Sequence, residues 1–330
     1  MRAARAVPHP DGGQVTVLDV PTPTPGPDQV LVKVKAAGLN RGETLQAGRA
    51  RSGEPQPIGV EFAGEVAAVG AGVSRWHTGD RVMGHGNGGQ AEYVLAAPRA
   101  LLRVPDTVSW VQAAAFPNVF ITAHDALITN GQLRSGETVL VNAASSGIGL
   151  AAIEIARAMG AGAVIATSRS ADKVERLGAL GVDCAIDVSS TDQVDAVTSC
   201  TAGRGVDVIV DSVGGTVFEA NLESLAVQGR LVNIGRLGSS SATIDLNALW
   251  LKRLKLIGVT FRTRTEEQRL ECVQACGRDL LAPFAAGTLR TIVDRTYRLD
   301  EIAAAHDYMK TDRHFGKIVL VVDDALVDAA

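Results

Sequence analysis

The stretch Thr138-Val-Leu-Val-Asn-Ala-Ala-Ser-Ser-Gly-Ile-Gly-Leu-Ala-Ala152 decides the fold of this 330-residue chain. It predicts a buried strand, a tight turn of small residues and an amphipathic helix that runs to Gly160. A turn without bulky side chains lets its backbone approach a diphosphate, and the first helical turn points N–H groups and a positive dipole end toward it. The stretch therefore indicates a dinucleotide-binding turn made by Ala144, Ser145, Ser146, Gly147, Ile148 and Gly149.

Short runs rich in valine and isoleucine alternate with helical patterns beyond this turn. We expect strands over 163–168, 184–188, 206–211 and 230–234, separated by helices over 171–180, 191–201 and 216–226. This alternation is typical of βαβ units around a parallel sheet with both faces covered. The middle of the chain is therefore predicted to be a doubly wound α/β domain of the Rossmann type.

Length and composition limit the class of protein. A chain of 330 residues suits two domains, and 46% hydrophobic with 4% aromatic residues is typical of a compact enzyme rich in small residues. A formal net charge of −4 without a basic block argues against nucleic acid or an anionic membrane as the main partner. Small-molecule chemistry is the expectation.

The amino terminus and the cysteines indicate a cytoplasmic protein. Residues 1–10 lack the apolar core of a secretory signal, and no apolar run approaches the length of a membrane span. Cys184, Cys200, Cys272 and Cys276 show no disulfide-framework spacing, so reduced thiols are expected. Cys272 and Cys276 would share a helix face, and we interpret them as buried small residues rather than a metal or redox pair.

The first third of the chain has short β-rich segments with Gly and Pro turns, and residues 316–322 form one more predicted strand. We expect this last strand to return to the first domain. The predicted domains are therefore residues 1–121 with 263–330, mainly β, and residues 122–262, which bind the nucleotide.

Several motifs stand in a recognisable order. They include Pro25-Gly-Pro-Asp-Gln-Val, Gly59-Val-Glu-Phe-Ala-Gly-Glu-Val66, Gly79-Asp-Arg-Val82, Gly89-Gln-Ala-Glu-Tyr-Val94, Asp211-Ser-Val-Gly-Gly215, Gly229-Arg-Leu-Val-Asn-Ile-Gly235 and Gly316-Lys-Ile-Val-Leu320. Over nearly its whole length the chain resembles the medium-chain dehydrogenases/reductases. The resemblance implies a GroES-like, mainly β catalytic domain beside the Rossmann domain.

Within that superfamily the chain is most similar to the zinc-free quinone oxidoreductases, the zeta-crystallin-like branch. Zinc alcohol dehydrogenases carry a catalytic Cys where this chain has Asn40 and a His where it has Val60. No cysteine precedes Cys184, so the four-cysteine structural zinc lobe is absent as well. We therefore expect no bound metal.

Without zinc, oxidation of simple alcohols loses its main electrostatic stabilisation, whereas a quinone or conjugated carbonyl compound is already primed for hydride attack. We therefore expect a reductase of quinones or other α,β-unsaturated carbonyl compounds. Two alternatives stay open. One is an enoyl-thioester reductase, in which Arg262 and Arg264 would form a basic entry for a coenzyme A or carrier arm. The other is a noncatalytic NADPH-binding sensor or crystallin-like protein.

The residues after the second strand of the Rossmann domain indicate the choice of cofactor. NAD enzymes present Asp or Glu there, whereas this chain has Ser168, Arg169 and Lys173, which can donate to a 2′-phosphate. Asp172 argues weakly against this interpretation, and the two cations could instead be ordinary solvated residues. NADPH is the predicted cofactor.

The resemblance also implies residues near the nicotinamide. It places Asn40, Thr122, Val213 and Gly235 there, and Phe261, which follows the strand over 255–260, could pack near the same ring. Asn40 could instead hold its own loop, Thr122 could cap a helix, and Phe261 could be a core aromatic residue. Asn40 is the expected positioning residue, and the proton donor is not identified.

Two further expectations concern catalysis and assembly. Glu61 and Asp80 are interpreted as mainly architectural, and no tyrosine occurs in the loop 40–48, where several relatives place an aromatic residue near the substrate. The apolar segment 243–251 and the strand over 255–260 lie at the predicted edge of the sheet. An exposed edge invites pairing, so a homodimer is expected, as the resembling family often forms.

Overall fold

The structure, a computed structural model, describes residues 1–9, 12–48, 52–323 and 325. The chain forms two compact units. Unit 1 comprises Met1–Val119 with Glu266–Ala330, and unit 2 comprises Phe120–Thr265. The sequence predicted divisions at residues 121/122 and 262/263.

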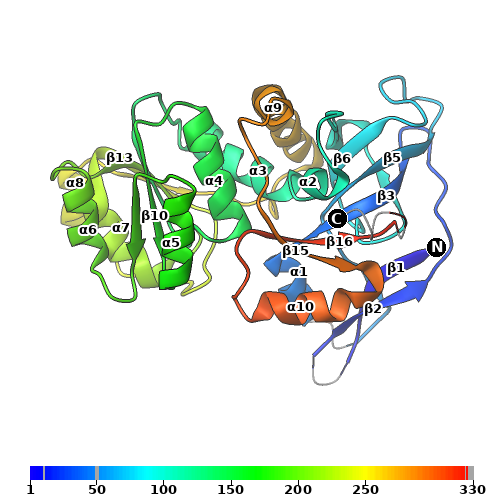
Figure 1. The fold of residues 1–330 in the computed structure, drawn as a ribbon, viewed down its shortest axis with the longest axis horizontal. Helices are drawn as coiled ribbons and strands as arrows, with labels where there is room; N and C mark the ends of the chain where they lie inside the picture. Colours follow the sequence, from blue (N-terminus) through cyan, green and yellow to red (C-terminus); the bar gives the residue numbers. More distant parts are fainter. Residues whose placement is uncertain (10–11, 49–51, 324, 326–330) are drawn as a thin grey trace. The chain divides into compact units, whose positions relative to one another are not determined.

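Unit 2 contains a six-stranded parallel sheet in the order β11-β10-β9-β12-β13-β14 (Figure 1). Its strands are β9 (Thr138–Val141), β10 (Ala163–Ser168), β11 (Cys184–Asp187), β12 (Val206–Asp211), β13 (Leu225–Asn233) and β14 (Lys255–Gly258). All residues of β9 are buried, as expected for an apolar strand covered on both faces. The predicted Rossmann-type sheet is confirmed.

Helices connect these strands. They are α4 (Gly147–Ala158), α5 (Ala171–Ala179), α6 (Gln193–Cys200), α7 (Phe218–Ser224) and α8 (Leu246–Leu251), and α3 (Pro117–His124) with the π-helix η2 (Asp125–Asn130) leads into the unit. Because the sheet grows in both directions from β9 and β12, right-handed crossovers put α4 and α5 on one face and α6 to α8 on the other. Val197 of α6 and Leu222 of α7 pack with Leu140 and Ile209 of the sheet.

Unit 1 contains a seven-stranded sheet and a three-stranded sheet. The larger has the order β15-β16-β3-β5-β6-β8 with β7 also paired to β3, and the smaller has the order β2-β1-β4. The strands are β1 (Arg2–Val7), β2 (Gln14–Asp19), β3 (Val30–Leu39), β4 (Gln56–Pro57), β5 (Glu61–Val69), β6 (Arg81–His85), β7 (Tyr93–Ala96), β8 (Leu101–Arg103), β15 (Val293–Arg298) and β16 (Lys317–Val321). The mainly β, GroES-like prediction is confirmed.

The last strand closes this unit. β16 runs antiparallel to β3, with Ile318 opposite Leu39. The predicted return of the carboxyl-terminal strand to the first domain is therefore confirmed. This pairing also brings Lys317, the first residue of β16, to the end of β3.

Four α-helices accompany these sheets in the described part of unit 1: α1 (Arg41–Ala47), α2 (Trp110–Ala114), α9 (Glu266–Ala285) and α10 (Ile302–Lys310). Ile302 and Met309 of α10 pack in the same buried cluster as Val32 and Phe62. The expectation of a loop over residues 40–48 is wrong, because α1 occupies most of it. The Glu43 carboxylate accepts a hydrogen bond from the Asn40 backbone N–H at 3.0 Å, which stabilises the first turn.

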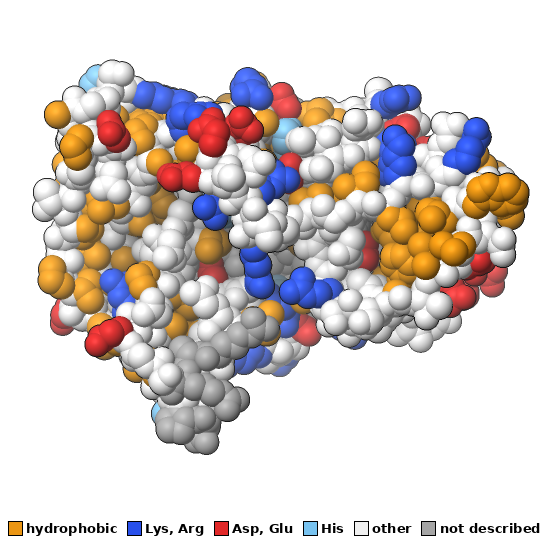
Figure 2. Space-filling model, turned by 180° about the vertical axis from the view of Figure 1, so that it is seen from behind, with side chains coloured by type: hydrophobic (Ala, Val, Ile, Leu, Met, Phe, Trp, Pro, Cys, Tyr) orange, Lys and Arg blue, Asp and Glu red, His pale blue; other side chains and the backbone are white. Residues whose placement is uncertain are grey.

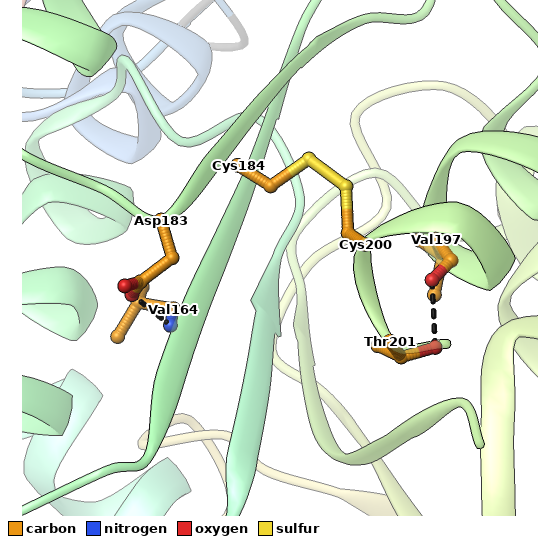
Figure 3. Close-up of a disulfide and its surroundings, with 6 residues drawn as sticks. All are labelled: Val164, Asp183, Cys184, Val197, Cys200 and Thr201. Carbon is orange, nitrogen blue, oxygen red and sulfur yellow. Dashed lines mark hydrogen bonds between the residues drawn. A yellow bond between two sulfur atoms is a disulfide. The ribbon is translucent and has the colours of Figure 1, made fainter. Parts of the chain in front are cut away.

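A disulfide joins Cys184 of β11 to Cys200, the last residue of α6 (Figure 3). The expectation of reduced thiols is wrong for this pair, whereas Cys272 and Cys276 are buried thiols that form no disulfide within the described residues, as predicted. The packing of α6 beside β11 brings the two Cα atoms to 6.5 Å, which is within disulfide range.

No helix of the described residues is long and apolar enough to span a bilayer.

Candidate functional sites

The predicted nucleotide-binding turn connects β9 to α4. Ala143 has a left-handed φ of 49°, which turns the chain sharply before the helix. Ser146 caps α4, since its Oγ accepts a hydrogen bond from Gly149 N at 3.1 Å and donates one to Ala143 O at 2.8 Å. The N–H groups of Gly147 and Ile148 lie in the first helical turn, where no intrahelical acceptor exists. This helix end can bind a diphosphate.

Gly149 keeps the helix close to the turn. A Cβ atom at this position would lie 2.6 Å from both Cα and O of Ala144. Since real Cβ atoms do not approach backbone that closely, only glycine fits here without a shift of the helix. The bare first turn of α4 therefore fits the diphosphate of a dinucleotide.

Backbone hydrogen bonds tie the turn to its neighbouring strands. Ala144 N donates to Thr167 O at 2.9 Å, near the end of β10, and Asn142 N donates to Val210 O at 3.0 Å, near the end of β12. The turn thus lies where the strand order reverses, at the carboxyl ends of the strands. Open α/β sheets bind ligands at this place.

The loops after β12 and β13 lie at the same edge of the sheet. Asp211 is fully buried, and its carboxylate accepts hydrogen bonds from Val213 N at 2.9 Å and Gly214 N at 3.0 Å. Burial raises the pKa of Asp211, and these bonds oppose that rise. A Cβ on Gly235 would lie 2.7 Å from Ser212 O, so the two loops pack closely. Val213 and Gly235 therefore belong to this edge.

The residues predicted to select the cofactor follow β10. Ser168 is the buried last residue of β10, Arg169 is exposed, and Lys173 lies in the first turn of α5. Within the described residues, the Arg169 side chain makes no hydrogen bond or ion pair. Asp172 is exposed in the first turn of α5, after the strand has ended.

Two other predicted nicotinamide residues lie elsewhere in unit 2. Thr122 lies inside α3, so the expectation that it starts a helix is wrong. The helix begins at Pro117, a residue type favoured at the first helical position. Phe261 follows β14, which ends at Gly258, and the Arg264 guanidinium carbon lies 5.3 Å from the centre of its ring.

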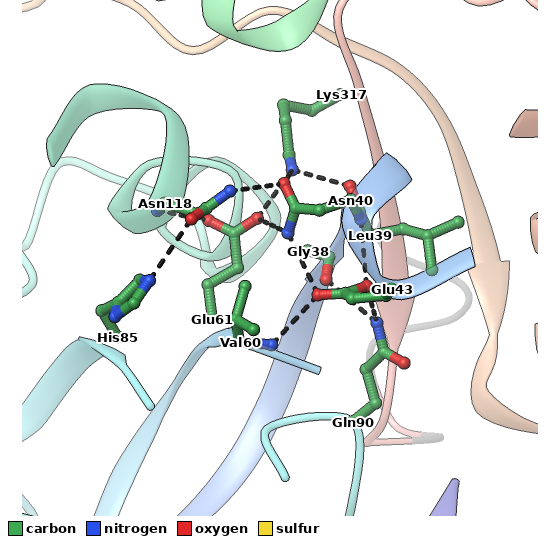
Figure 4. Close-up of polar contacts among 10 residues, drawn as sticks. All are labelled: Gly38, Leu39, Asn40, Glu43, Val60, Glu61, His85, Gln90, Asn118 and Lys317. Carbon is green, nitrogen blue, oxygen red and sulfur yellow. Dashed lines mark hydrogen bonds and ion pairs between the residues drawn. The ribbon is translucent and has the colours of Figure 1, made fainter. Parts of the chain in front are cut away.

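Unit 1 holds a second candidate site, a cluster of buried and half-buried polar side chains (Figure 4). We call it the unit-1 polar cluster, and it comprises Asn40, Glu43, Glu61, Gln90, Asn118 and Lys317. Glu61, the first residue of β5, is fully buried. Its Oε1 accepts from Lys317 Nζ at 2.6 Å and Asn40 Nδ2 at 2.8 Å, and its Oε2 accepts from Asn118 N at 2.8 Å.

The amide of Asn40 uses all its hydrogen-bonding capacity inside this cluster. Its Nδ2 donates to Glu61 and, at 3.2 Å, to Glu43 Oε1. Its Oδ1 accepts from Asn118 Nδ2 at 2.9 Å and from Lys317 Nζ at 2.8 Å. An amide has two donor hydrogens and two acceptor lone pairs, so a contact with a ligand would require one of these bonds to be exchanged.

Glu43 is the second buried carboxyl group of the cluster. It accepts hydrogen bonds from Val60 N at 3.0 Å and Gln90 Nε2 at 2.8 Å in addition to those from Asn40. Burial raises the pKa of Glu43 to about 7, against the opposing effects of the Asn40 bonds and the Lys317 charge. Near neutral pH this carboxyl group is therefore divided between its protonated and ionised forms.

His85 lies at the border of the cluster. Its Nε2 is 3.3 Å from Asn118 Oδ1, and burial lowers the pKa of the ring. A neutral imidazole is therefore favoured, and its Nε2–H can donate to the Asn118 carbonyl oxygen.

Asn118 and Lys317 were not predicted as site residues, and Glu61 was interpreted as architectural. Glu61 lies at the centre of the cluster. The spacing of Asn40 and Glu43 is that of a helix cap, a local signal that predicts α1. No local signal joins Glu61 to Lys317. Among the described residues, no group of three or more His, Cys, Asp or Glu side chains is arranged to hold a metal ion.

Comparisons with known proteins agree with this two-unit description. Residues 26–106 match a family described as the alcohol dehydrogenase GroES-like domain, and residues 147–275 match one described as zinc-binding dehydrogenase. The human protein named quinone oxidoreductase is 31% identical over 316 residues, which are 93% of each chain.

Two solved structures are also similar. A mycobacterial protein in complex with NADPH has a TM-score of 0.85 and 29% identity, covering 98% of this chain and 100% of that one. The CurK enoyl reductase has a TM-score of 0.83 and 27% identity, covering 98% of this chain and 99% of that one.

Proposed function

Because the chain belongs to the quinone oxidoreductase branch of the medium-chain dehydrogenase/reductase superfamily, an oxidoreductase family, we propose that it reduces quinones and other α,β-unsaturated carbonyl compounds with NADPH and without a metal ion. The observation that carries the proposal is the buried ammonium of Lys317, which lies between Glu61 and Asn40.

Lys317 supports the metal-free part of the proposal. A zinc ion needs ligand atoms at about 2.0–2.3 Å. Asn40 Oδ1 and Glu61 Oε1 instead face Nζ of Lys317 at 2.8 and 2.6 Å, so a divalent ion on these oxygens would lie against a buried positive charge. The family match described as zinc-binding dehydrogenase covers residues 147–275, which include neither Asn40 nor Val60.

Reduction of an activated acceptor is the reaction that best suits such a site. A quinone or conjugated carbonyl compound accepts hydride without a Lewis acid more readily than a simple ketone does. In unit 1, Lys317 and Asn118 donate to Oδ1 of Asn40, and its Nδ2 donates to Glu61 and Glu43, so the amide is held at both ends. We therefore assign Asn40 a positioning role and assign the final proton to water.

The predicted cofactor-binding residues account for the NADPH part of the proposal. The turn over 144–149 would hold the diphosphate, and Ser168 with Arg169 would hold the 2′-phosphate, with Lys173 near them on α5. When bound, NADPH supplies the hydride. The similar structure that contains NADPH supports this assignment. Direct contacts of Asn40, Thr122, Val213, Gly235 and Phe261 with the nicotinamide stay predictions.

An acceptor screen tests the proposal. Purified protein should consume NADPH with 9,10-phenanthrenequinone, and EDTA should leave the rate unchanged. Stoichiometric zinc that EDTA removes together with activity would contradict the metal-free part. NADPH binding without turnover of any quinone or enone would instead indicate a noncatalytic sensor or crystallin-like protein.

An enoyl-thioester reductase is the second candidate, because the chain is also similar to the CurK enoyl reductase. A crotonyl thioester would then be reduced with a higher kcat/KM than the quinone. The same assay, with the two acceptors compared at equal NADPH, separates the candidates.

We also propose a homodimer formed at the β14 edge of unit 2. Trp250 is 73% exposed, Leu246 and Leu251 are each 67% exposed, and Leu256 of β14 is 40% exposed. Figure 2 shows hydrophobic side chains gathered on this end of unit 2. An open sheet edge beside an exposed apolar surface is typical of an interface.

The cytoplasmic location stays a prediction.

A further inference from the structure

A cavity of about 380 Å³ lies in unit 2 where the parallel strands begin. The nucleotide-binding turn lies where they end, so the cavity is at the opposite edge of the sheet. We call it the amino-edge pocket. Its charged lining residues are Arg134, Glu137, Asp207, Arg230, Arg253 and Lys255.

Both acidic residues of the pocket are already neutralised by arginines. Arg230 binds Glu137 with two bonds of 2.9 and 2.6 Å, and Arg204 binds Asp207 with two bonds of 2.8 Å. Burial alone would raise the pKa of each carboxyl group, but these bonds lower both below their ordinary values. Neither acid is therefore available to balance the other cations.

Three cations of the pocket lack a counter-charge. Arg134, Arg253 and Lys255 are exposed, and within the part of the chain that the structure describes their side chains make no hydrogen bond or ion pair. They come from the loop before β9 and from the segment that enters β14. Positive charges that share one cavity repel each other, and an anion bound among them would relieve that repulsion.

The backbone around the pocket supports a role for its side chains. Gln132, Gln228 and Arg253 have left-handed φ values of 49°, 67° and 52°, and all three line the pocket. Glycine would adopt this conformation without strain, so a long polar side chain at each position comes at a conformational cost. The side chains at these positions place amide or guanidinium hydrogen-bond donors at the cavity.

We propose that the amino-edge pocket binds a small, multiply charged anion that carries phosphate. Arginine forks and a lysine ammonium are the groups that bind phosphate oxygens best, and the glutamine amides add neutral donors. The volume suits a small molecule. The absence of a basic block in the sequence argues against a nucleic acid at this place.

Isothermal titration at constant ionic strength tests the proposal, with inorganic pyrophosphate and 3-phosphoglycerate as probes. At least one probe should bind, and the tighter of the two indicates whether the natural anion is inorganic or organic. The double variant R253Q/K255Q should weaken binding roughly tenfold or more. The control K33Q/R278Q removes two exposed cations from unit 1 and should change nothing.

The nucleotide site could also bind these probes, so Arg169→Ala is measured in parallel. Binding that persists in Arg169→Ala and weakens in R253Q/K255Q supports the amino-edge pocket. Three results would overturn the proposal: no binding of either probe, equal weakening in R253Q/K255Q and K33Q/R278Q, or loss of all binding in Arg169→Ala. None of these results depends on the proposed reductase activity.

Discussion

Lys317 and Glu61 form an ion pair of 2.6 Å, with side chains that are only 4% and 0% exposed. Burial of two charges costs several kcal/mol per ion, and their attraction repays this cost only when further hydrogen bonds complete the geometry. The bonds to Asn40, Asn118 and Leu39 O supply that completion. The pair therefore holds Asn40 in one orientation.

Replacement of Lys317 by methionine should lower the free energy of unfolding by about 3–5 kcal/mol, because it leaves the Glu61 charge buried without its partner. Urea unfolding measures the change. Lys33→Met, at an exposed position of β3, is the matched control and should stay within about 0.5 kcal/mol of the wild type. If the double variant Lys317→Met/Glu61→Gln is not more stable than Lys317→Met alone, the electrostatic explanation fails.

Arg169→Ala should weaken NADPH binding by roughly 10- to 100-fold, since a charge-assisted contact with the 2′-phosphate is lost. NADH binding should change little. Fluorescence titration with both nucleotides measures the two dissociation constants. Arg176→Ala removes an exposed arginine further along α5 and serves as the control. Equal losses for NADPH and NADH would refute the assigned role of Arg169.

His306 should make unit 1 sensitive to acid. Burial, aided by the Lys310 charge, lowers the pKa of this ring to about 4, below its ordinary value of 6.5. The unfolded chain therefore binds a proton more readily than the folded one below pH 6.5. The neutral His306 ring therefore makes its full contribution to the free energy of unfolding above pH 6.5. As the pH falls toward 4, the free energy of unfolding decreases by about 3 kcal/mol.

The variant His306→Gln tests this assignment, because glutamine can still hydrogen-bond to Thr44 Oγ1, which lies 3.1 Å from Nδ1 of the ring. The free energy of unfolding should fall less steeply between pH 6.5 and 4 in the variant than in the wild type. Parallel curves for the two proteins would show that another group causes the acid sensitivity.

Trp250→Glu should convert the proposed dimer into a monomer, because it places a charge within the exposed apolar surface of α8. Analytical ultracentrifugation at several protein concentrations measures the mass. Leu45→Glu, at a residue that is 51% exposed in unit 1, is the control and should keep the wild-type mass. A wild-type protein that is monomeric at all concentrations would rule out the dimer.

Cys200→Ser should destabilise the oxidised protein by about 3 kcal/mol, since the disulfide closes a loop between residues 16 apart. Unfolding in urea, with and without dithiothreitol, measures the effect. The reductant should lower the stability of the wild type and leave the variant unchanged. If dithiothreitol does not change the stability of the wild type, and Cys184 and Cys200 both titrate as thiols, the disulfide does not form.

The sequence predicted unit 2 well because its signals are local. The strands over 163–168 and 206–211 are found at the residues expected, since apolar runs and glycine turns indicate both their type and their ends. The disulfide escaped prediction because Cys184 and Cys200 meet only once α6 packs beside β11. Pairings of this kind depend on tertiary structure and leave no mark on the spacing.

The unit-1 polar cluster was harder to predict for the same reason. Lys317 and Glu61 are 256 positions apart, and only the pairing of β16 with β3 brings them together. Asn40 was chosen from a family resemblance, which did not show that its amide is fully bonded within the unit. The predicted start of the helix at Thr122 was wrong, because α3 already begins at Pro117.

The return of β16 to β3 has a consequence for biosynthesis. Unit 2 is continuous in sequence, so it can fold on the ribosome while the segment after Thr265 is still being made. Unit 1 cannot, because Glu61 is synthesised 256 residues before Lys317, its partner in the ion pair. A nascent chain that stalls before Gly316 would expose an unpaired strand edge, and it should be this half that recruits chaperones.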